Sequence, residues 1–137
     1  MSQDINLRIW DERRCHVGEG PVAIGRDNSD VLWVDIMGKL VHRRNLKTGI
    51  TSSYETTEHV SFVIPAADGS ELLGTANGPI RRSPDGSISK LPTRLDTDGG
   101  EPPFPNRWND AKVAPDGHLF LGNMPYEWAE NQSACGL

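Results

Sequence analysis

Several polar side chains near the end of the chain are of types that handle oxygen-rich small molecules. Arg107, Asn109 and Asp110 stand at the start of an apolar run that ends at Val113. A Pro-Asp-Gly turn then leads to a second apolar run, and Glu127 follows it. Turns of this kind join two strands into an antiparallel pair. Since both free ends of such a pair lie away from its turn, we expect Arg107, Asn109 and Glu127 to share one rim.

The chemistry of these side chains suits a polar ligand. A guanidinium offers forked donors, and an amide offers both a donor and an acceptor, for hydroxyl and carbonyl oxygens. A carboxylate can accept a proton. Neither Arg107 nor Asn109 is a nucleophile. On the residues alone the plainer interpretation is favoured: Arg107 as a surface ion pair, Asn109 as a turn former and Glu127 as a solvated acid.

Composition limits the kind of protein that can carry such a rim. The 137 residues are 36% hydrophobic and 24% charged, which predicts one small folded domain. A net charge of -5 argues against nucleic acid as a partner. Cys15 and Cys135 have no CxxC spacing. A membrane-spanning helix needs about 18 consecutive apolar residues, and no segment of the sequence approaches this length. We expect a cytoplasmic protein with reduced thiols that does not bind a membrane.

Short apolar runs separated by turns recur along the chain. A shift of 48 residues places Asp68-Gly69 on Asp116-Gly117, and a shift of 40 places Leu72-Leu73 on Leu32-Trp33. A repeated unit of several short strands at this spacing is typical of a β-propeller blade. The sequence therefore predicts an all-β fold, with Trp33 and Phe120 in the core.

The third repeat unit is shorter than the first two. Gly38-Lys39-Leu40 and Gly78-Pro79-Ile80 open a further run in the earlier units, whereas the corresponding Gly136-Leu137 is where the sequence stops. Propellers close with roughly 4 to 8 blades. We therefore expect about three blades with the last incomplete. Residues 1–137 would then be the N-terminal part of a longer single domain, or the product of a truncated gene.

Four segments, in this order, resemble the gluconolactonase, regucalcin (senescence marker protein) and luciferin-regenerating enzyme family. They are Gly18-Glu19-Gly20-Pro21-Val22, Trp33-Val34-Asp35-Ile36, Arg107-Trp108-Asn109-Asp110-Ala111-Lys112-Val113 and the run from Pro115-Asp116-Gly117 to Leu121-Gly122-Asn123-Met124. The resemblance covers nearly the whole chain but only about the first half of a family member. It implies a six-bladed β-propeller that binds one divalent metal ion in its central channel and hydrolyses sugar lactones.

The resemblance also implies roles for single residues. Glu19 matches the family's first metal-ligating glutamate, and its place between two glycines predicts a sharply turning loop. Arg107 and Asn109 match substrate-contacting residues, and Glu127 lies where the family has a further substrate-contacting acid. We therefore expect Glu19, Arg107, Asn109 and Glu127 to face one shared polar concavity near the propeller axis. The implied metal is Ca²⁺, with Zn²⁺, Mn²⁺ or Mg²⁺ as alternatives. Such an ion polarises the lactone carbonyl and positions water.

Departures from the family pattern leave a second hypothesis open. Ala111 replaces the usual Gly of Asn-Asp-Gly-Lys, and Asn123 replaces the usual Thr of Gly-Thr-Met. The Asn and Asp that complete the metal site, including the general-base Asp, belong to the second half of the family sequence, so no catalytic residue is assigned in this chain. The alternative is a non-catalytic, calcium-binding or regulatory propeller, or an inactive truncated product. The four histidines show no metal-ligand spacing: His16, His42, His59 and His118.

Overall fold

The computed structural model describes residues 6–92 and 106–125, and every regular element in these two ranges is a β-strand. Blade 1 consists of β1 (Gly18–Ile24), β2 (Asp30–Asp35), β3 (Leu40–Asn45) and β4 (Thr51–Glu55). Blade 2 consists of β5 (Val60–Pro65), β6 (Glu71–Thr75), β7 (Gly78–Arg82) and β8 (Ile88–Lys90). The described part of blade 3 consists of β9 (Asn106–Val113) and β10 (Leu119–Pro125).

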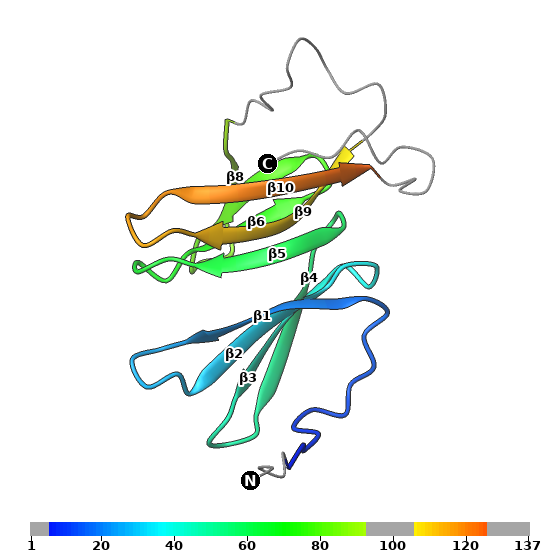
Figure 1. Cartoon of the computed structure of the whole chain (residues 1–137), viewed down its shortest axis with the longest axis vertical. Helices are drawn as coiled ribbons and strands as arrows, with labels where there is room; N and C mark the ends of the chain where they lie inside the picture. The colour runs from blue at the N-terminus through cyan, green and yellow to red at the C-terminus, as the bar shows by residue number, and fades with distance from the viewer. Residues whose placement is uncertain (1–5, 93–105, 126–137) are drawn as a thin grey trace, which may run out of the picture.

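Each blade is an antiparallel sheet whose strands lie in sequence order. The first strands of the three blades, β1, β5 and β9, are the inner strands of the stack. They run in the same direction, with β5 between the other two (Figure 1). The expected all-β arrangement of successive blades is therefore confirmed. None of the described residues forms a helix long and apolar enough to cross a lipid bilayer.

The Asp-Gly pairs form the turns that the sequence predicts. Gly69 and Gly117 have φ angles of 82° and 90°, in the left-handed region that glycine adopts without strain. The Gly69 N–H donates to the carbonyl of Ala66 at 3.1 Å, and the Gly117 N–H donates to that of Ala114 at 2.9 Å. Both turns connect the first and second strands of a blade. The 48-residue shift thus relates equivalent hairpins of blades 2 and 3.

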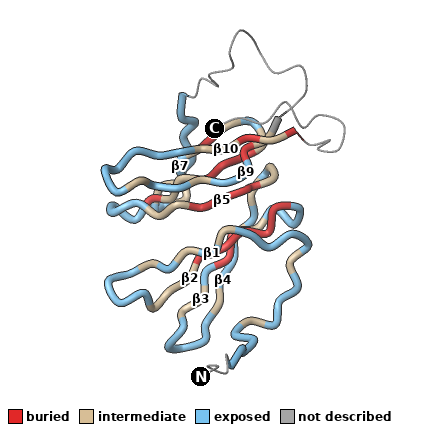
Figure 2. Tube along the Cα trace, viewed as in Figure 1, coloured by how far each residue is buried: buried red, intermediate tan, exposed pale blue. Residues whose placement is uncertain are grey.

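The hydrophobic core lies between blades 1 and 2 (Figure 2). Blade 1 contributes Leu32, Val34, Ile36 and Val41, and blade 2 contributes Val60, Val63 and Leu73. Full burial of one such side chain stabilises the fold by about 1.5–3 kcal/mol. Because neighbouring side chains on a strand alternate between faces, the opposite face of blade 1 carries Trp33, Asp35 and His42.

One of the two aromatic residues assigned to the core is placed differently from the prediction. Trp33 is buried, with 8% of its surface exposed, as expected. Phe120 is 56% exposed, and the prediction that it is a core residue was wrong. Phe120 pairs with the exposed Lys112 across the β9–β10 ladder, so this face of blade 3 points to solvent. The apolar run of β10 gave no sign of which face would be covered.

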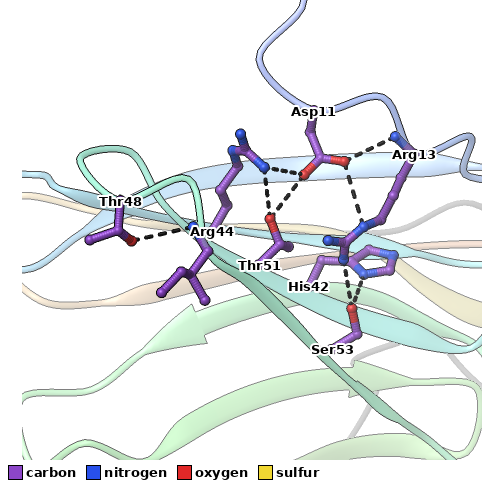
Figure 3. Close-up of polar contacts among 8 residues, drawn as sticks. Asp11, Arg13, His42, Arg44, Thr48, Thr51 and Ser53 are labelled. Carbon is purple, nitrogen blue, oxygen red and sulfur yellow. Dashed lines mark hydrogen bonds and ion pairs between the residues drawn. The ribbon is translucent and has the colours of Figure 1, made fainter.

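Residues 10–17 pack against the face of blade 1 that is turned away from blade 2. Trp10 meets Trp33 edge-to-face at 5.3 Å between ring centroids. The Asp11 carboxylate accepts a hydrogen bond from Arg44 at 3.2 Å (Figure 3). Arg13 reaches the Ser53 hydroxyl of β4 at 3.0 Å. These contacts attach the N-terminal segment to the second, third and fourth strands of the blade.

A polar clamp joins the outer parts of blades 1 and 2. The Tyr54 hydroxyl of β4 donates to Glu71 Oε2 of β6 at 2.6 Å. The Arg82 guanidinium lies 4.1 Å from the centre of the Tyr54 ring and 3.6 Å from Glu71 Oε2. Burial, together with the neighbouring Glu71 carboxylate, raises the pKa of Tyr54. The phenol therefore stays protonated and keeps its role as a donor.

Removing this hydroxyl is expected to weaken the contact between the two blades. Tyr54→Phe keeps the ring under Arg82 but deletes a hydrogen bond to a charged acceptor, which is worth about 1.5–3 kcal/mol. The free energy of unfolding, measured in urea, should fall by that amount. Ser52→Ala, at an exposed position of the same strand, is the control and should change it by less than about 0.5 kcal/mol. Equal stability of Tyr54→Phe and the unchanged protein would contradict the clamp.

Candidate functional site

Each inner strand contains one extra residue near its start. The ladder between the first and second strands slips by one position at Gly20-Pro21 in β1, at Ser61 in β5 and at Asn109-Asp110 in β9. Such a β-bulge bends its strand and re-aims the side chains at that point. Because the three inner strands run in the same direction, the three bulges lie at the same end of the stack (Figure 1).

The bulge of β9 brings together two of the expected site residues. Arg107 Nη1 donates to Asn109 Oδ1 at 3.2 Å and to the carbonyl of Trp108 at 3.1 Å. Arg107 is half-buried, and Asn109 is exposed. The guanidinium is therefore anchored through one nitrogen while the amide beside it faces solvent. The expected proximity of the two residues is present, and their role toward a substrate stays a prediction.

The neighbouring inner strand supports this pair through Ser61. The Ser61 hydroxyl at the β5 bulge donates to the carbonyl of Trp108 and accepts from Arg107 Nη1 at 3.4 Å. Ser61 is 2% exposed. It was not among the expected site residues, although a signal for it exists in the sequence. The 48-residue shift that superposes the Asp-Gly turns also places Ser61 on Asn109.

Glu19 lies in strand β1, and the prediction that it stands in a loop was wrong. It pairs with Val34 of β2, immediately before the bulge at Gly20-Pro21. Gly20 has a φ angle of 58°, so the bulge absorbs the backbone bend that the glycines and proline had suggested. The Glu19 side chain is exposed.

Glu19 and the Arg107–Asn109 pair lie at the same end of β1 and β9, with β5 between them (Figure 1). Glu127, the fourth expected site residue, lies outside the described residues. That all four face one concavity therefore stays a prediction.

The described residues do not by themselves fit a complete calcium site at this end of the stack. Ca²⁺ prefers carboxylate and carbonyl oxygens, which the exposed Glu19 carboxylate provides. It takes about 6 to 8 oxygen ligands, however, and one carboxylate cannot hold the ion against its hydration shell.

A buried carboxylate on β2 was also missed. Asp35 Oδ1 accepts from the backbone N–H groups of Val17 and Gly38, at 2.9 and 3.0 Å, and Oδ2 accepts from that of His16 at 2.8 Å. Burial raises the pKa of Asp35, but the hydrogen bonds from these three N–H groups together lower it by more. The pKa of Asp35 therefore lies below its ordinary value. The sequence feature that could have pointed to Asp35 is a single acidic residue inside the apolar run 31–36.

Comparison with known proteins gives a consistent assignment. Residues 17–137 match the family described as the SMP-30/Gluconolactonase/LRE-like region. The chain is 32% identical over 115 residues to a pentonolactonase of Haloferax volcanii, covering 84% of this chain and 37% of that protein.

Two solved structures have a closely similar fold. One is a calcium-binding protein, regucalcin, from Agrobacterium tumefaciens, with TM-score 0.72 and 25% identity over 88% of this chain and 39% of that chain. The other is a luciferin-regenerating enzyme, with TM-score 0.68 and 25% identity over 82% of this chain and 38% of that chain. The chain therefore spans less than two fifths of each of these relatives. With a family match over most of its length and three successive antiparallel blades, the chain belongs to the SMP-30/gluconolactonase/LRE-like family.

Proposed function

We propose that this chain supplies substrate-binding residues and one metal ligand of a sugar-lactone hydrolase. The observation that carries the proposal is the hydrogen-bonded Arg107–Asn109 pair at the bulge of an inner strand. Family membership and the 32% identity to a pentonolactonase support a lactone as the substrate. The chain covers 37% of that relative. We propose that residues 1–137 are the N-terminal part of one propeller domain.

Arg107 and Asn109 would bind and orient the lactone. Since Nη1 of Arg107 is held by Asn109 and Trp108, the plane of the guanidinium is fixed before a ligand arrives. Nε and Nη2 would then donate to the lactone carbonyl or to a ring hydroxyl, and the Asn109 amide would contact a neighbouring hydroxyl. Holding the carbonyl in one orientation favours attack by water, since less freedom is lost in the transition state. Attack opens the ring and yields the hydroxy acid.

Glu19 is the residue of this chain that we propose as a metal ligand, and Glu127 as a further substrate contact. Ca²⁺ is the first choice of ion because the donor is a carboxylate, with Zn²⁺, Mn²⁺ and Mg²⁺ as alternatives. A bound divalent ion supplies polarisation of the lactone carbonyl. The remaining ligands and the general base would come from later blades. A role in calcium binding without catalysis is the second candidate, favoured by the similarity to a calcium-binding regucalcin.

Hydrolysis of aldonolactones, followed with and without a chelator, tests the proposal. The 137-residue chain is compared with a chimera in which the later blades of a related lactonase complete the ring. We expect the chain alone to be inert and the chimera to be active, with Glu19→Ala abolishing both calcium binding and turnover. Chelator-sensitive turnover by the chain alone would show that its site is complete. A metal-loaded chimera inert toward every lactone would instead support the calcium-binding role.

The fork of donors on Arg107 gives a sharper test in the same chimera. Arg107→Lys keeps the charge but loses the paired N–H groups, and hydrogen bonds to a charged group are worth about 1.5–3 kcal/mol. We therefore expect kcat/KM to fall by about 10- to 150-fold. Lys112→Arg, on the exposed face of the same strand, is the control and should leave kcat/KM unchanged. An unaltered kcat/KM in Arg107→Lys would remove Arg107 from the binding site.

A further inference from the structure

A cluster of three potential metal ligands lies on the face of blade 1 that is turned away from blade 2. A carboxylate oxygen of Asp35, a ring nitrogen of His42 and the sulfur of Cys15 all lie within 4.8 Å of one another. Asp35 and His42 are 5% and 4% exposed, and Cys15 is half-buried. The three residues come from different elements: the N-terminal segment, β2 and β3. The fold, rather than local sequence, therefore assembles the cluster.

The hydrogen bonds of Asp35 leave room for a metal ion. A carboxylate has about four lone-pair positions. Two backbone N–H groups use both positions on Oδ1, and the N–H of His16 uses one on Oδ2. One lone pair on Oδ2 therefore remains. N–H groups that donate to a ligating carboxylate hold it in place for the metal ion.

The imidazole of His42 is oriented in the same way. His42 Nδ1 and the Ser53 hydroxyl are 2.6 Å apart, and Ser53 Oγ also accepts from Arg13 Nη1 (Figure 3). We assign the proton to Nδ1, donating to Ser53, which leaves the Nε2 lone pair for a ligand. Metal-bound histidines nearly always donate the N–H of their other ring nitrogen to an oxygen acceptor. The ring also lies against Trp33, with 4.9 Å between centroids, which limits its rotation.

We propose that Cys15, Asp35 and His42 form a binding site for a zinc-type divalent metal ion, with water as the fourth ligand. Thiolate, imidazole and carboxylate are the ligands of tetrahedral zinc. Bonds of about 2.0–2.3 Å place such ligand atoms about 3.3–3.8 Å apart, so the cluster must contract slightly. Cys15 precedes β1 in the chain and reaches the surface, so it can supply this movement and admit the water.

Charge favours the same ion. A thiolate and a carboxylate together neutralise a divalent cation, which lowers the cost of burying all three. The Arg13 guanidinium near His42 opposes a cation, and the Asp11 carboxylate, which Arg13 approaches to 3.6 Å, offsets it. Sulfur and imidazole are poor ligands for Ca²⁺ and Mg²⁺.

This zinc-type site is separate from the proposed Glu19 ligand. Residues directly opposite in a ladder share a face, so Glu19 lies on the face of Val34. Asp35 is the next residue and points to the other face. Loss of one site therefore leaves the other in place, and the zinc-type site can be tested without lactonase activity.

Cobalt spectroscopy tests the site in the 137-residue chain. Co²⁺ is added to the metal-free, reduced protein carrying Cys135→Ser, which removes the second thiol. We expect 1:1 binding, a thiolate-to-cobalt charge-transfer band and the intense d–d bands of four-coordinate Co²⁺, all reversed by stoichiometric Zn²⁺. Cys15→Ser should abolish the charge-transfer band, and Ser53→Ala should weaken binding by about 10- to 100-fold. Two controls, His16→Gln at an exposed neighbouring position and Glu19→Gln, should leave the charge-transfer band and the cobalt affinity unchanged.

Two outcomes would overturn the proposal. One is a cobalt spectrum without a charge-transfer band, and the other is a band that survives Cys15→Ser. If Cys15→Ser does not fold, the rate of Cys15 modification by a disulfide reagent is measured in the Cys135→Ser protein instead. Zn²⁺ should slow this modification at least about tenfold, since a coordinated thiolate is not free to attack. An equal rate with and without Zn²⁺ would refute the site.

Discussion

Replacing Asp35 by asparagine is expected to destabilise the metal-free chain by about 3–5 kcal/mol. Asparagine has the same shape but only one acceptor oxygen, and its NH₂ group would face an N–H donor. At least one of the backbone N–H groups of His16, Val17 and Gly38 would lose its acceptor. An unsatisfied buried donor costs about 1–3 kcal/mol, and more where the lost partner is charged. A domain of this size is stable by about 5–15 kcal/mol, so this loss is a large fraction of the total.

Urea unfolding of the two proteins, with chelator present, measures the effect of Asp35→Asn. Asp85→Asn is the matched control: Asp85 also accepts a backbone N–H, from Ser87 at 2.9 Å, but in an exposed turn. This control should cost less than about 1 kcal/mol, because water replaces the lost acceptor. Similar costs for the two substitutions would show that the Asp35 contacts do not hold the N-terminal segment to blade 1.

The pH dependence of stability gives a second measure of Asp35. Its pKa is lower in the folded chain than its ordinary value of 3.8. The stabilisation of the fold by the Asp35 carboxylate is therefore complete above pH 3.8 and is lost as the pH falls through the lower, folded-state pKa. Between neutral pH and the acid transition, the free energy of unfolding of Asp35→Asn should lie below that of the unchanged protein. The difference between the two should narrow below about pH 4. A gap independent of pH would assign the loss to shape rather than to charge.

Replacing Gly74 by alanine is expected to destabilise the chain by about 2–3 kcal/mol. Gly74 of β6 pairs with Phe62 of β5, and the Phe62 ring lies directly over it. An added Cβ would lie 2.6 Å from Phe62 Cζ and closer still to other ring atoms. Phe62 is 2% exposed, so the ring cannot move aside without disturbing its neighbours. Overpacking of this kind costs about 1–3 kcal/mol.

A double-mutant cycle separates this clash from a general effect of alanine. Phe62→Leu shortens the side chain that meets the new methyl group. In that background Gly74→Ala should cost at least about 1 kcal/mol less than in the unchanged protein. The measurement is the free energy of unfolding of all four proteins. An additive result would mean that Gly74 is needed for its backbone conformation and not for the space above it.

The features that the sequence predicted correctly are those determined by near neighbours. The Asp-Gly turns at Gly69 and Gly117 follow from backbone freedom at single residues. The blade repeat follows from alternation within short runs. The error at Glu19 also has a local origin, because a Gly-Pro pair is compatible with both a loop and a bulge, and only pairing with β2 distinguishes them. Whether Phe120 is buried depends on which face of blade 3 is covered, and the residues near it in the sequence do not determine this.

The missed residues depend on contacts across the fold. Ser61 was part of a recognised strand, but its contact with Arg107 joins residues 46 positions apart on neighbouring blades. Asp35 was part of a recognised segment. The backbone N–H groups that donate to it come from the residues just before β1 and from the turn after β2. The Cys15–Asp35–His42 cluster has no regular spacing because three elements supply it. In each case the residue type was visible and its partner was not.

The bulge that recurs in each inner strand bears on how such a protein diversifies. A bulged residue stands outside the regular ladder, and the bend at the bulge re-aims its side chain. Gly20-Pro21, Ser61 and Asn109-Asp110 occupy these positions and differ completely in chemistry. When a blade is duplicated, the copy brings a bulge at the same end of the stack. Blades with the same strand order thus present different side chains at this end, because the residues in their bulges differ.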